Sequence, residues 1–137
     1  MITAMVLTAI LDIAWVFGSG IYSNYIAGSL DPVTIAGLWA LVIVSQTILL
    51  HMLTRGETSW RSRALLGALQ GFTVYAVYNI TAKVVFPSAM WPTNIALTDT
   101  VWGTLLFSLV AALTTPDINI AFNPALMHPA SIMSPLT

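Results

Sequence analysis

Four apolar segments dominate this chain of 137 residues, at about residues 2–22, 33–53, 64–86 and 95–113. A helix needs about 20 mostly apolar residues to cross the roughly 30 Å hydrocarbon core of a bilayer. Each segment is close to that length, and none of them alternates in polarity as the strands of a transmembrane β-barrel do. The pattern therefore predicts an all-α fold, an integral membrane bundle of four transmembrane helices.

The composition excludes several other classes of protein. Charged residues make up 7% of the chain, whereas a soluble domain carries roughly 25%. The hydrophobic fraction of 58% is too high for a disordered chain, which needs low hydrophobicity and high charge. A net charge of −1 provides no basic surface for nucleic acid, and the absence of cysteine excludes disulfides, thiolate catalysis and cysteine-bound metals.

The links between the segments predict a helix start and an orientation. Asp31 is a favourable N-cap residue and Pro32 suits the first helical position, so together they predict where the second helix begins. Arg55, Arg61 and Arg63 all lie in the link between the second and third segments. The positive-inside rule places this link on the cytoplasmic side, or its topological equivalent, and both termini on the same side.

Aromatic residues near the segment ends predict contacts with the membrane interfaces. We expect Trp60 to anchor the face that carries the arginines, and four residues to anchor the opposite face: Tyr22, Tyr25, Trp39 and Trp91. Bound lipid is the ligand that we expect along these surfaces.

Polar side chains inside the predicted spans are the most informative residues, because such groups are costly in lipid and face protein or water. Counting from the arginine side at 1.5 Å per residue places them at two depths. We predict one polar layer of Asp12, Gln46 and Tyr75 near mid-membrane, and a second of Asn79, Lys83 and Asp99 towards the far side, with Lys83 paired to Asp99. The network is interpreted as structural hydrogen bonds between helices; the alternative is a proton or ion pathway.

Small residues and histidines are the remaining candidate positions. Gly67 and Gly71 form a GxxxG pattern, which with Gly103 predicts a close approach of helix backbones. His51 or His128 could ligate a haem or a chlorophyll magnesium, but neither has a second histidine at helical spacing, so we expect no cofactor or metal. No nucleophile lies beside a base and no phosphate-binding loop is present, so we expect no catalytic residue and no enzyme activity.

Three motifs together resemble a known family. They are DxxW, YxxYNxT and DxxWG, carried by Leu11-Asp12-Ile13-Ala14-Trp15, by Gly71 with Tyr75-Ala76-Val77-Tyr78-Asn79-Ile80-Thr81, and by Trp91-Pro92 with Asp99-Thr100-Val101-Trp102-Gly103-Thr104. Over about residues 5–113 the chain resembles an uncharacterised family of small, mainly bacterial, predicted four-helix membrane proteins, a domain of unknown function. The resemblance implies a fold and a topology but no reaction. The chain departs from the family at Asn79, where members usually carry an acidic residue, and at Ala82, where they usually carry Asn.

Residues 115–137 differ in composition from the rest of the chain. Their four prolines argue against a long helix, and the segment is too apolar for a free linker. We therefore predict an extended C-terminal tail after a four-helix domain of residues 1–114, which docks on a partner subunit through residues that include Pro116, Phe122, Pro124, Met127 and Pro129. The alternative is that the tail folds back over the arginine-side face of its own bundle.

The function that these features favour is that of a non-catalytic accessory or structural subunit in a larger membrane complex, whether respiratory, photosynthetic or viral. Small size, sparse polar chemistry and the apolar tail support it. Its partners would be lipids and other membrane-protein subunits, not nucleic acid. The alternative is a small homo-oligomeric transporter or channel that uses Asp12 and Asp99. An intramembrane enzyme has the least support.

Overall fold

Four α-helices make up the described part of the chain, which comprises residues 1–20, 31–86 and 91–114 of a computed structural model. They are α1 (Ile2–Gly18), α2 (Pro32–Thr54), α3 (Trp60–Val85) and α4 (Thr93–Leu113). The all-helical fold with four helices is the one predicted. The first helix ends at Gly18 rather than near residue 22, because the chain leaves helical space at Gly20, where φ is +67°.

The start of α2 follows the local chemistry predicted for it. Asp31 is the N-cap residue, and its Oδ1 accepts hydrogen bonds from the backbone N–H groups of Val33 and Thr34, each at 3.0 Å. Pro32 occupies the first helical position, where the missing N–H has no helical partner to lose. The Thr34 hydroxyl, followed by the Thr34 backbone N–H, lowers the pKa of the exposed Asp31 carboxyl below its ordinary value of 3.8.

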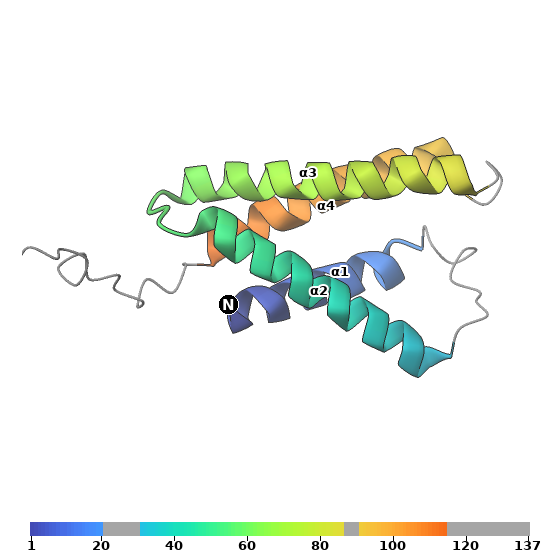
Figure 1. Ribbon diagram of the computed structural model, residues 1–137, viewed down its shortest axis with the longest axis horizontal. Coiled ribbons are helices and arrows are strands. Elements are labelled where there is room, and N and C mark those ends of the chain that lie inside the picture. Colours follow the sequence, from blue (N-terminus) through green and yellow to red (C-terminus); the bar gives the residue numbers. More distant parts are fainter. Residues whose placement is uncertain (21–30, 87–90, 115–137) are drawn as a thin grey trace, which may run out of the picture.

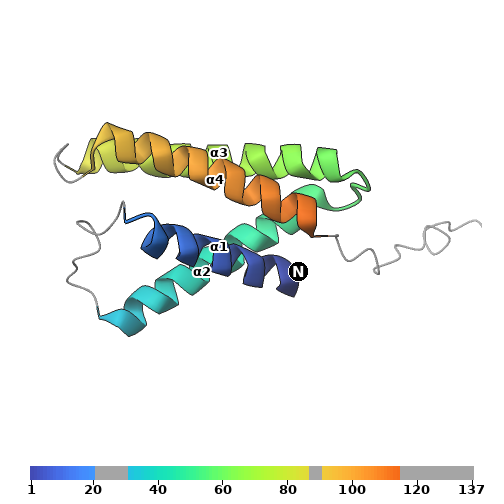
Figure 2. The ribbon, with the colours of Figure 1, turned by 180° about the vertical axis from the view of Figure 1, so that it is seen from behind.

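Helices α3 and α4 form an antiparallel pair and lie side by side along most of their length in Figure 1 and Figure 2. A Cβ atom at Gly67 would overlap the backbone carbonyl of Phe107. A Cβ atom at Gly71 would overlap the carbonyl of Gly103, and one at Gly103 would overlap the Tyr75 ring. All three glycines predicted as packing positions therefore lie in this one interface, where only glycine leaves room for the opposite helix.

Helices α1 and α2 cross one another beside the α3–α4 pair (Figure 1, Figure 2). α2 meets α3 near the link at residues 55–59 and diverges from it towards its own start. Contacts of α1 and α2 with the other helices are much sparser than those between α3 and α4. The small apolar core lies at the arginine end and consists of Ala4, Leu50, Leu106, Phe107, Val110 and Ala111. The two helix pairs therefore pack most closely at that end.

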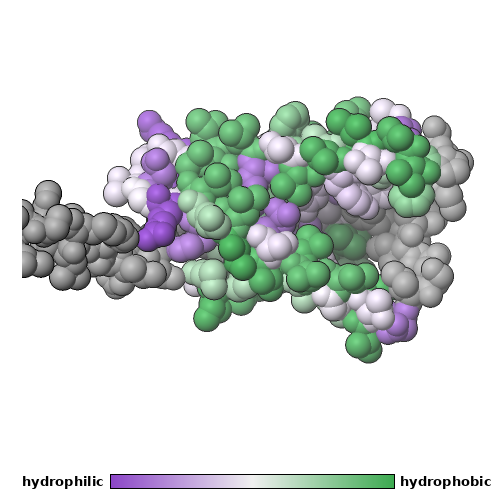
Figure 3. Space-filling view, in the orientation of Figure 1, coloured by the Kyte–Doolittle hydropathy of each residue, from purple (hydrophilic) through white to green (hydrophobic). Residues whose placement is uncertain are grey.

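The distribution of side chains is the reverse of that in a soluble protein. Large apolar side chains are exposed on every helix, and the exposed fraction reaches 82% at Val84 and 81% at Val33. Figure 3 shows hydrophobic side chains over much of the visible surface. Polar side chains are buried instead, among them Asn79 and Asp99. Apolar groups outside and polar groups inside are what a lipid solvent favours.

Among the described helices, α2 and α4 are long and apolar enough to cross a membrane. α1 is also apolar but has 17 residues. α3 has 26 residues and buries several polar side chains, including Arg63 and Gln70. Length and composition therefore identify two candidate spans where the sequence predicted four.

Candidate ligand-binding cavity

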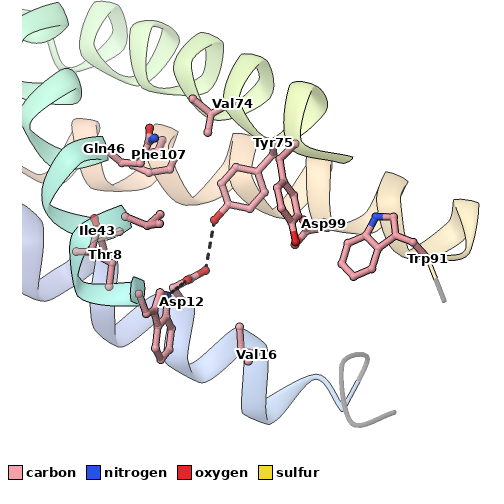
Figure 4. Close-up of a pocket in the computed structure, with 13 residues that line it drawn as sticks. Thr8, Asp12, Val16, Ile43, Gln46, Val74, Tyr75, Trp91, Asp99 and Phe107 are labelled. Atoms are coloured by element: carbon pink, nitrogen blue, oxygen red, sulfur yellow. Dashed lines mark hydrogen bonds between the residues drawn. The ribbon is translucent and has the colours of Figure 1, made fainter. Parts of the chain in front are cut away.

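A cavity of about 580 Å³ lies between the α1–α2 pair and the α3–α4 pair. Figure 3 shows a hollow on the face between α2 and α3, and Figure 4 shows the side chains around the cavity. Small-molecule sites commonly measure about 300–1,000 Å³ and combine mostly apolar walls with a few polar groups. The described wall fits this pattern, because it combines aliphatic and aromatic side chains with the carboxylates of Asp12 and Asp99.

Asp12 of α1 connects all four helices beside the cavity. Its Oδ2 accepts a hydrogen bond from Trp39 Nε1 of α2 at 2.8 Å. Its Oδ1 accepts one from Trp102 Nε1 of α4 at 3.2 Å and a longer one from the Tyr75 hydroxyl of α3 at 3.4 Å, drawn in Figure 4. An indole N–H can only donate, so both carboxylate oxygens act as acceptors. One carboxylate thus binds a side chain from each of the other helices.

Trp102 brings two of the sequence motifs together. Its ring stacks on that of Trp15 in α1, with centroids 4.7 Å apart and an interplanar angle of 9°, while its N–H binds Asp12. Gly103, the next residue, leaves the space that the Tyr75 ring fills. Asp12 and Trp102 are 90 positions apart in the chain, so the DxxW and DxxWG motifs describe one cluster in space.

A second polar cluster joins α3 to the start of α4. Asn79 Nδ2 donates to Asp99 Oδ2 at 3.0 Å and to Thr100 Oγ1 at 3.1 Å. Trp91 Nε1 donates to Asn79 Oδ1 at 2.9 Å. Because the indole can only donate, this bond fixes the orientation of the Asn79 amide and turns its NH₂ group towards Asp99. The contact of Asn79 with Asp99 lies within the far polar layer that the sequence predicted.

Lys83 takes a different partner from the one predicted. Its Nζ donates to the Trp91 carbonyl oxygen at 3.0 Å, so the ammonium group binds backbone just before α4. Lys83 lies in the last turn of α3, where its flexible stem can carry the charge out of the helix interface. The expected pairing of Lys83 with Asp99 is therefore not formed. The Asn79 amide binds the Asp99 carboxylate, and the Trp91 carbonyl binds the Lys83 ammonium group.

Gln46 lines the cavity but does not bind Asp12 in the way that the near polar layer predicted. Gln70 Nε2 of α3 donates to Gln46 O at 2.9 Å and to Gln46 Oε1 at 3.2 Å. Two buried side-chain atoms have no hydrogen-bond partner within the described residues, Gln70 Oε1 and Thr8 Oγ1. Thr8 is also among the residues that line the cavity.

The expected interface anchors divide into two groups. Trp60 is exposed at the arginine end, where the Arg61 guanidinium lies 5.5 Å from the centroid of its ring. Trp39 and Trp91 line the cavity and donate their N–H groups to interior partners, so each has a role inside the protein that the prediction of interface anchors did not include. The indole N–H was the signal for an inward role, because a donor among apolar residues needs an acceptor. Tyr22 and Tyr25 lie outside the described residues.

Arg63 makes a contact that the sequence did not reveal. The side chain is buried, and its Nε donates to the Ala111 carbonyl at 3.1 Å and its Nη2 to the Ala112 carbonyl at 3.3 Å. Its Nη1 donates to the carbonyls of Thr58 at 3.0 Å and Glu57 at 3.3 Å. The last carbonyls of a helix have no helical donors and carry the negative end of its dipole. Arg63 therefore caps α4 and fixes the α2–α3 link to it.

The remaining candidate positions lie away from the cavity or outside the described residues. His51 is partly buried near the end of α2. In residues 1–20, 31–86 and 91–114, no group of three or more His, Asp or Glu could hold a metal ion. His128, the predicted tail and its contact residues fall beyond residue 114, among them Pro116, Phe122, Pro124, Met127 and Pro129.

Comparison with known proteins agrees with the motifs. A family model described as "Predicted membrane protein (DUF2177)" matches residues 1–116. No curated protein and no solved structure matches the chain significantly. The match spans all four helices, and with them the clusters around Asp12 and Asp99. The chain therefore belongs to the DUF2177 family of predicted membrane proteins.

Proposed function

We propose that the protein is a small multi-pass membrane transporter whose solute site is the cavity between its two helix pairs. The observation that carries the proposal is the presence of Asp12 and Asp99 in the wall of one cavity. Ionisable residues within membrane segments are rare and usually mark substrate or ion pathways. The alternative predicted from the sequence was a small homo-oligomeric transporter or channel that uses Asp12 and Asp99, and the cavity favours a transporter over an accessory subunit.

The proposal includes four membrane-spanning helices. A 17-residue helix such as α1 is at the lower limit for crossing a bilayer. α1 and α3 both expose large apolar side chains, for example Ile10 at 58% and Leu69 at 61%, as a lipid-facing surface requires. Arg55 and Arg61 lie at the end opposite the start of α2, which supports a cytoplasmic location for that end, the N-terminus and the end of α4.

The two helix pairs supply the parts that would move. Transporters commonly expose a central site to either side by moving one group of helices against another. The α3–α4 pair is closely packed through its glycines, whereas the hydrogen bonds of Asp12 to Tyr75 and Trp102 connect α1 to that pair beside the cavity. In the proposed cycle these bonds break and re-form as the α1–α2 pair swings.

Flux into proteoliposomes tests the proposal. Vesicles loaded with a pH-sensitive dye receive an inside-negative potential, and internal acidification is recorded. We expect proton flux above that of protein-free vesicles, and a loss of about tenfold in Asp99→Asn. Asp31→Asn is the matched control, because it removes an exposed carboxylate outside the cavity and keeps a good N-cap residue. Flux equal to that of protein-free vesicles, or unchanged flux in Asp99→Asn, would contradict transport through this site.

A subunit of a larger complex is the second proposal, and the exposed face of α2 favours it. Val33, Leu41 and Met52 are all more than half exposed, so α2 offers an apolar surface to another membrane protein as well as to lipid. Native mass spectrometry of the protein extracted gently from its own membrane separates the two proposals. A large hetero-complex would support the subunit, and a single chain or small homo-oligomer would support the transporter. Neither proposal includes enzyme activity.

A further inference from the structure

We propose that the cavity binds a monovalent organic cation, an ammonium or phosphonium group that carries apolar substituents. This inference rests on the proposed function, because it names the chemical class of solute for the same cavity. Binding can nevertheless be measured whether or not the solute moves. The charge and the aromatic rings of the cavity wall both point to such a ligand.

The described wall of the cavity is negatively charged. It includes the carboxylates of Asp12 and Asp99, and no Lys, Arg or His is among the described residues that line it. The ammonium group of Lys83 binds the Trp91 carbonyl. The three groups that bind Asp12 are two indoles and a phenol, so they orient the carboxylate without cancelling its charge. A cation in the cavity would supply that opposite charge.

Aromatic side chains enclose the same space. Tyr78 and Trp91 meet edge to face, with centroids 5.9 Å apart and an interplanar angle of 84°. Tyr75 and Phe107 meet in the same way at 6.4 Å and 62°. With Trp39, all of these residues line the cavity. Rings set at steep angles form the corners of an aromatic cage, in which ring faces attract quaternary ammonium and similar cations.

The rest of the wall favours an organic cation over a metal ion. Val16, Val42, Ile43 and Val74 complete it, and hydrocarbon offers no ligands to a metal. Mg²⁺ and Ca²⁺ need about six or more oxygen ligands. Apolar substituents on an organic cation would instead gain from burial against these side chains. A volume of about 580 Å³ is typical of a pocket for a small organic molecule and is far larger than a bare ion needs.

Thr8 is a buried polar residue near the carboxylate of Asp12. Its side chain is 2% exposed, lines the cavity, and carries a buried hydroxyl with no hydrogen-bond partner in the described residues. A buried polar group without a partner costs free energy, and native structures usually satisfy it. Thr8 lies four positions before Asp12, on the same face of α1. The hydroxyl oxygen is closed off in the cavity as it stands, so a substituted ammonium group held by Asp12 would reach it only after the wall adjusts.

Two ions of the same shape and opposite charge provide the first test. Tetraphenylphosphonium and tetraphenylborate are titrated into the purified full chain in a neutral maltoside detergent. Binding is followed by calorimetry and by tryptophan emission, which should respond because Trp39 and Trp91 line the cavity. We expect saturable binding of the phosphonium with a change in emission, and at least about tenfold weaker binding of the borate. Equal binding of the two ions, or binding of neither, would overturn the proposal.

Variants then assign the binding to this cavity. Asp99→Asn should weaken phosphonium binding about tenfold, whereas Asp31→Asn should leave it unchanged. Equal affinity in Asp99→Asn and the unaltered protein would exclude this site. If Asp99→Asn does not fold, the comparison of the two ions on the unaltered protein still decides the charge preference.

Two sources of organic cation remain to be separated, a free solute and the choline headgroup of a lipid. Adding a phosphocholine detergent to the maltoside micelles, both without net charge, should displace the phosphonium if the headgroup is the ligand and leave it bound if the ligand is a free solute. Failure of transport is a separate result. Phosphonium binding without proton flux retains the cage and rejects a transporter that moves protons through Asp99, whereas flux that depends on Asp99 without phosphonium binding rejects the proposed solute.

Discussion

The α3–α4 pair and the α1–α2 pair are held in this molecule by different means. Between α3 and α4, the backbone of one helix occupies the space that side chains would need at Gly67 and Gly71 of the other. Gly18 of α1 and Gly37 of α2 have open space around them instead. Near the cavity, the contact of α1 with α3 and α4 includes the hydrogen bonds of Asp12.

The difference shows two ways in which helices can associate in a membrane, by close backbone packing and by hydrogen bonds between side chains. Lipid is as apolar as leucine, so helices in a membrane associate through close packing and polar contacts rather than through the hydrophobic effect. Close backbone packing leaves little freedom, because any shift loses many contacts together. Hydrogen bonds between side chains can be exchanged one at a time. The cavity lies between a pair joined by close backbone packing and a pair whose contacts with it include the hydrogen bonds of Asp12.

Overpacking the rigid interface should have the largest effect. Gly71→Leu would drive a side chain into the Gly103 carbonyl, and we expect a loss of about 3 kcal/mol or more in the free energy of unfolding. The matched control is Gly37→Ala, which meets no atom within 4 Å and should be neutral or stabilising by up to about 1 kcal/mol. Unfolding in mixed micelles, followed by circular dichroism, measures both. Equal effects of the two variants would show that the interface tolerates a side chain.

Loss of the α4 cap should have the next largest effect. Arg63→Lys keeps the charge but cannot reach the four carbonyls that the guanidinium binds, because a lysine lacks the planar fork. We expect a destabilisation of about 2 kcal/mol. Arg61→Lys changes the same residue type at an exposed position and should alter stability by less than about 0.5 kcal/mol. If both variants melt at the same temperature, Arg63 contributes charge alone.

A double-mutant cycle measures the hydrogen bond between Asp12 and Trp102. Asp12→Asn and Trp102→Phe, made singly and together, should show a coupling free energy of about 1 kcal/mol, in the range of hydrogen bonds between membrane helices. Asp12→Asn with Trp60→Phe is the control cycle, since Trp60 is exposed at the arginine end, and its coupling should be near zero. Additivity in both cycles would mean that the bond at 3.2 Å contributes nothing measurable.

The smallest effect on stability should come from Asp31, the exposed N-cap residue of α2. The folded protein holds the pKa of Asp31 below its ordinary value of 3.8, so ionised Asp31 stabilises α2 above that pH. The contribution is lost as the pH falls through the lowered pKa. The melting temperature of the unaltered protein should therefore approach that of Asp31→Asn in strong acid. A constant difference between the two from neutral pH to well below 3.8 would contradict this.

Patterns along a single helix were sufficient for much of the fold. The Asp31-Pro32 pair set the start of α2, because capping depends on neighbouring residues alone. Spacing also gave the small-residue stripe of Gly67 and Gly71, which lies against α4. Depth along the membrane normal placed Asp12 beside Tyr75, since rise per residue is fixed in a helix.

Patterns along one helix could not predict the contacts that depend on how far each helix is rotated about its own axis. Counting residues gives a height but not a direction, so Gln46 was placed beside Asp12, whereas it binds Gln70. Lys83 was paired by height with Asp99 and instead reaches the Trp91 carbonyl. The role of Arg63 was hidden for the same reason, because the carbonyls that it binds belong to the far end of another helix.

The contacts between α3 and α4 repeat every four residues, and this regularity limits how the chain can change in length. Starting from the arginine end, Arg63 lies against Ala111, Gly67 against Phe107 and Gly71 against Gly103, and we call these three contacts the rungs of a ladder. One residue added within either helix would turn all later positions by about 100°, so every rung beyond it would point away from its partner. A substitution alters one rung at a time, but an insertion changes the register of every rung that follows it. Changes in length should therefore be tolerated in the links and rejected between the motifs.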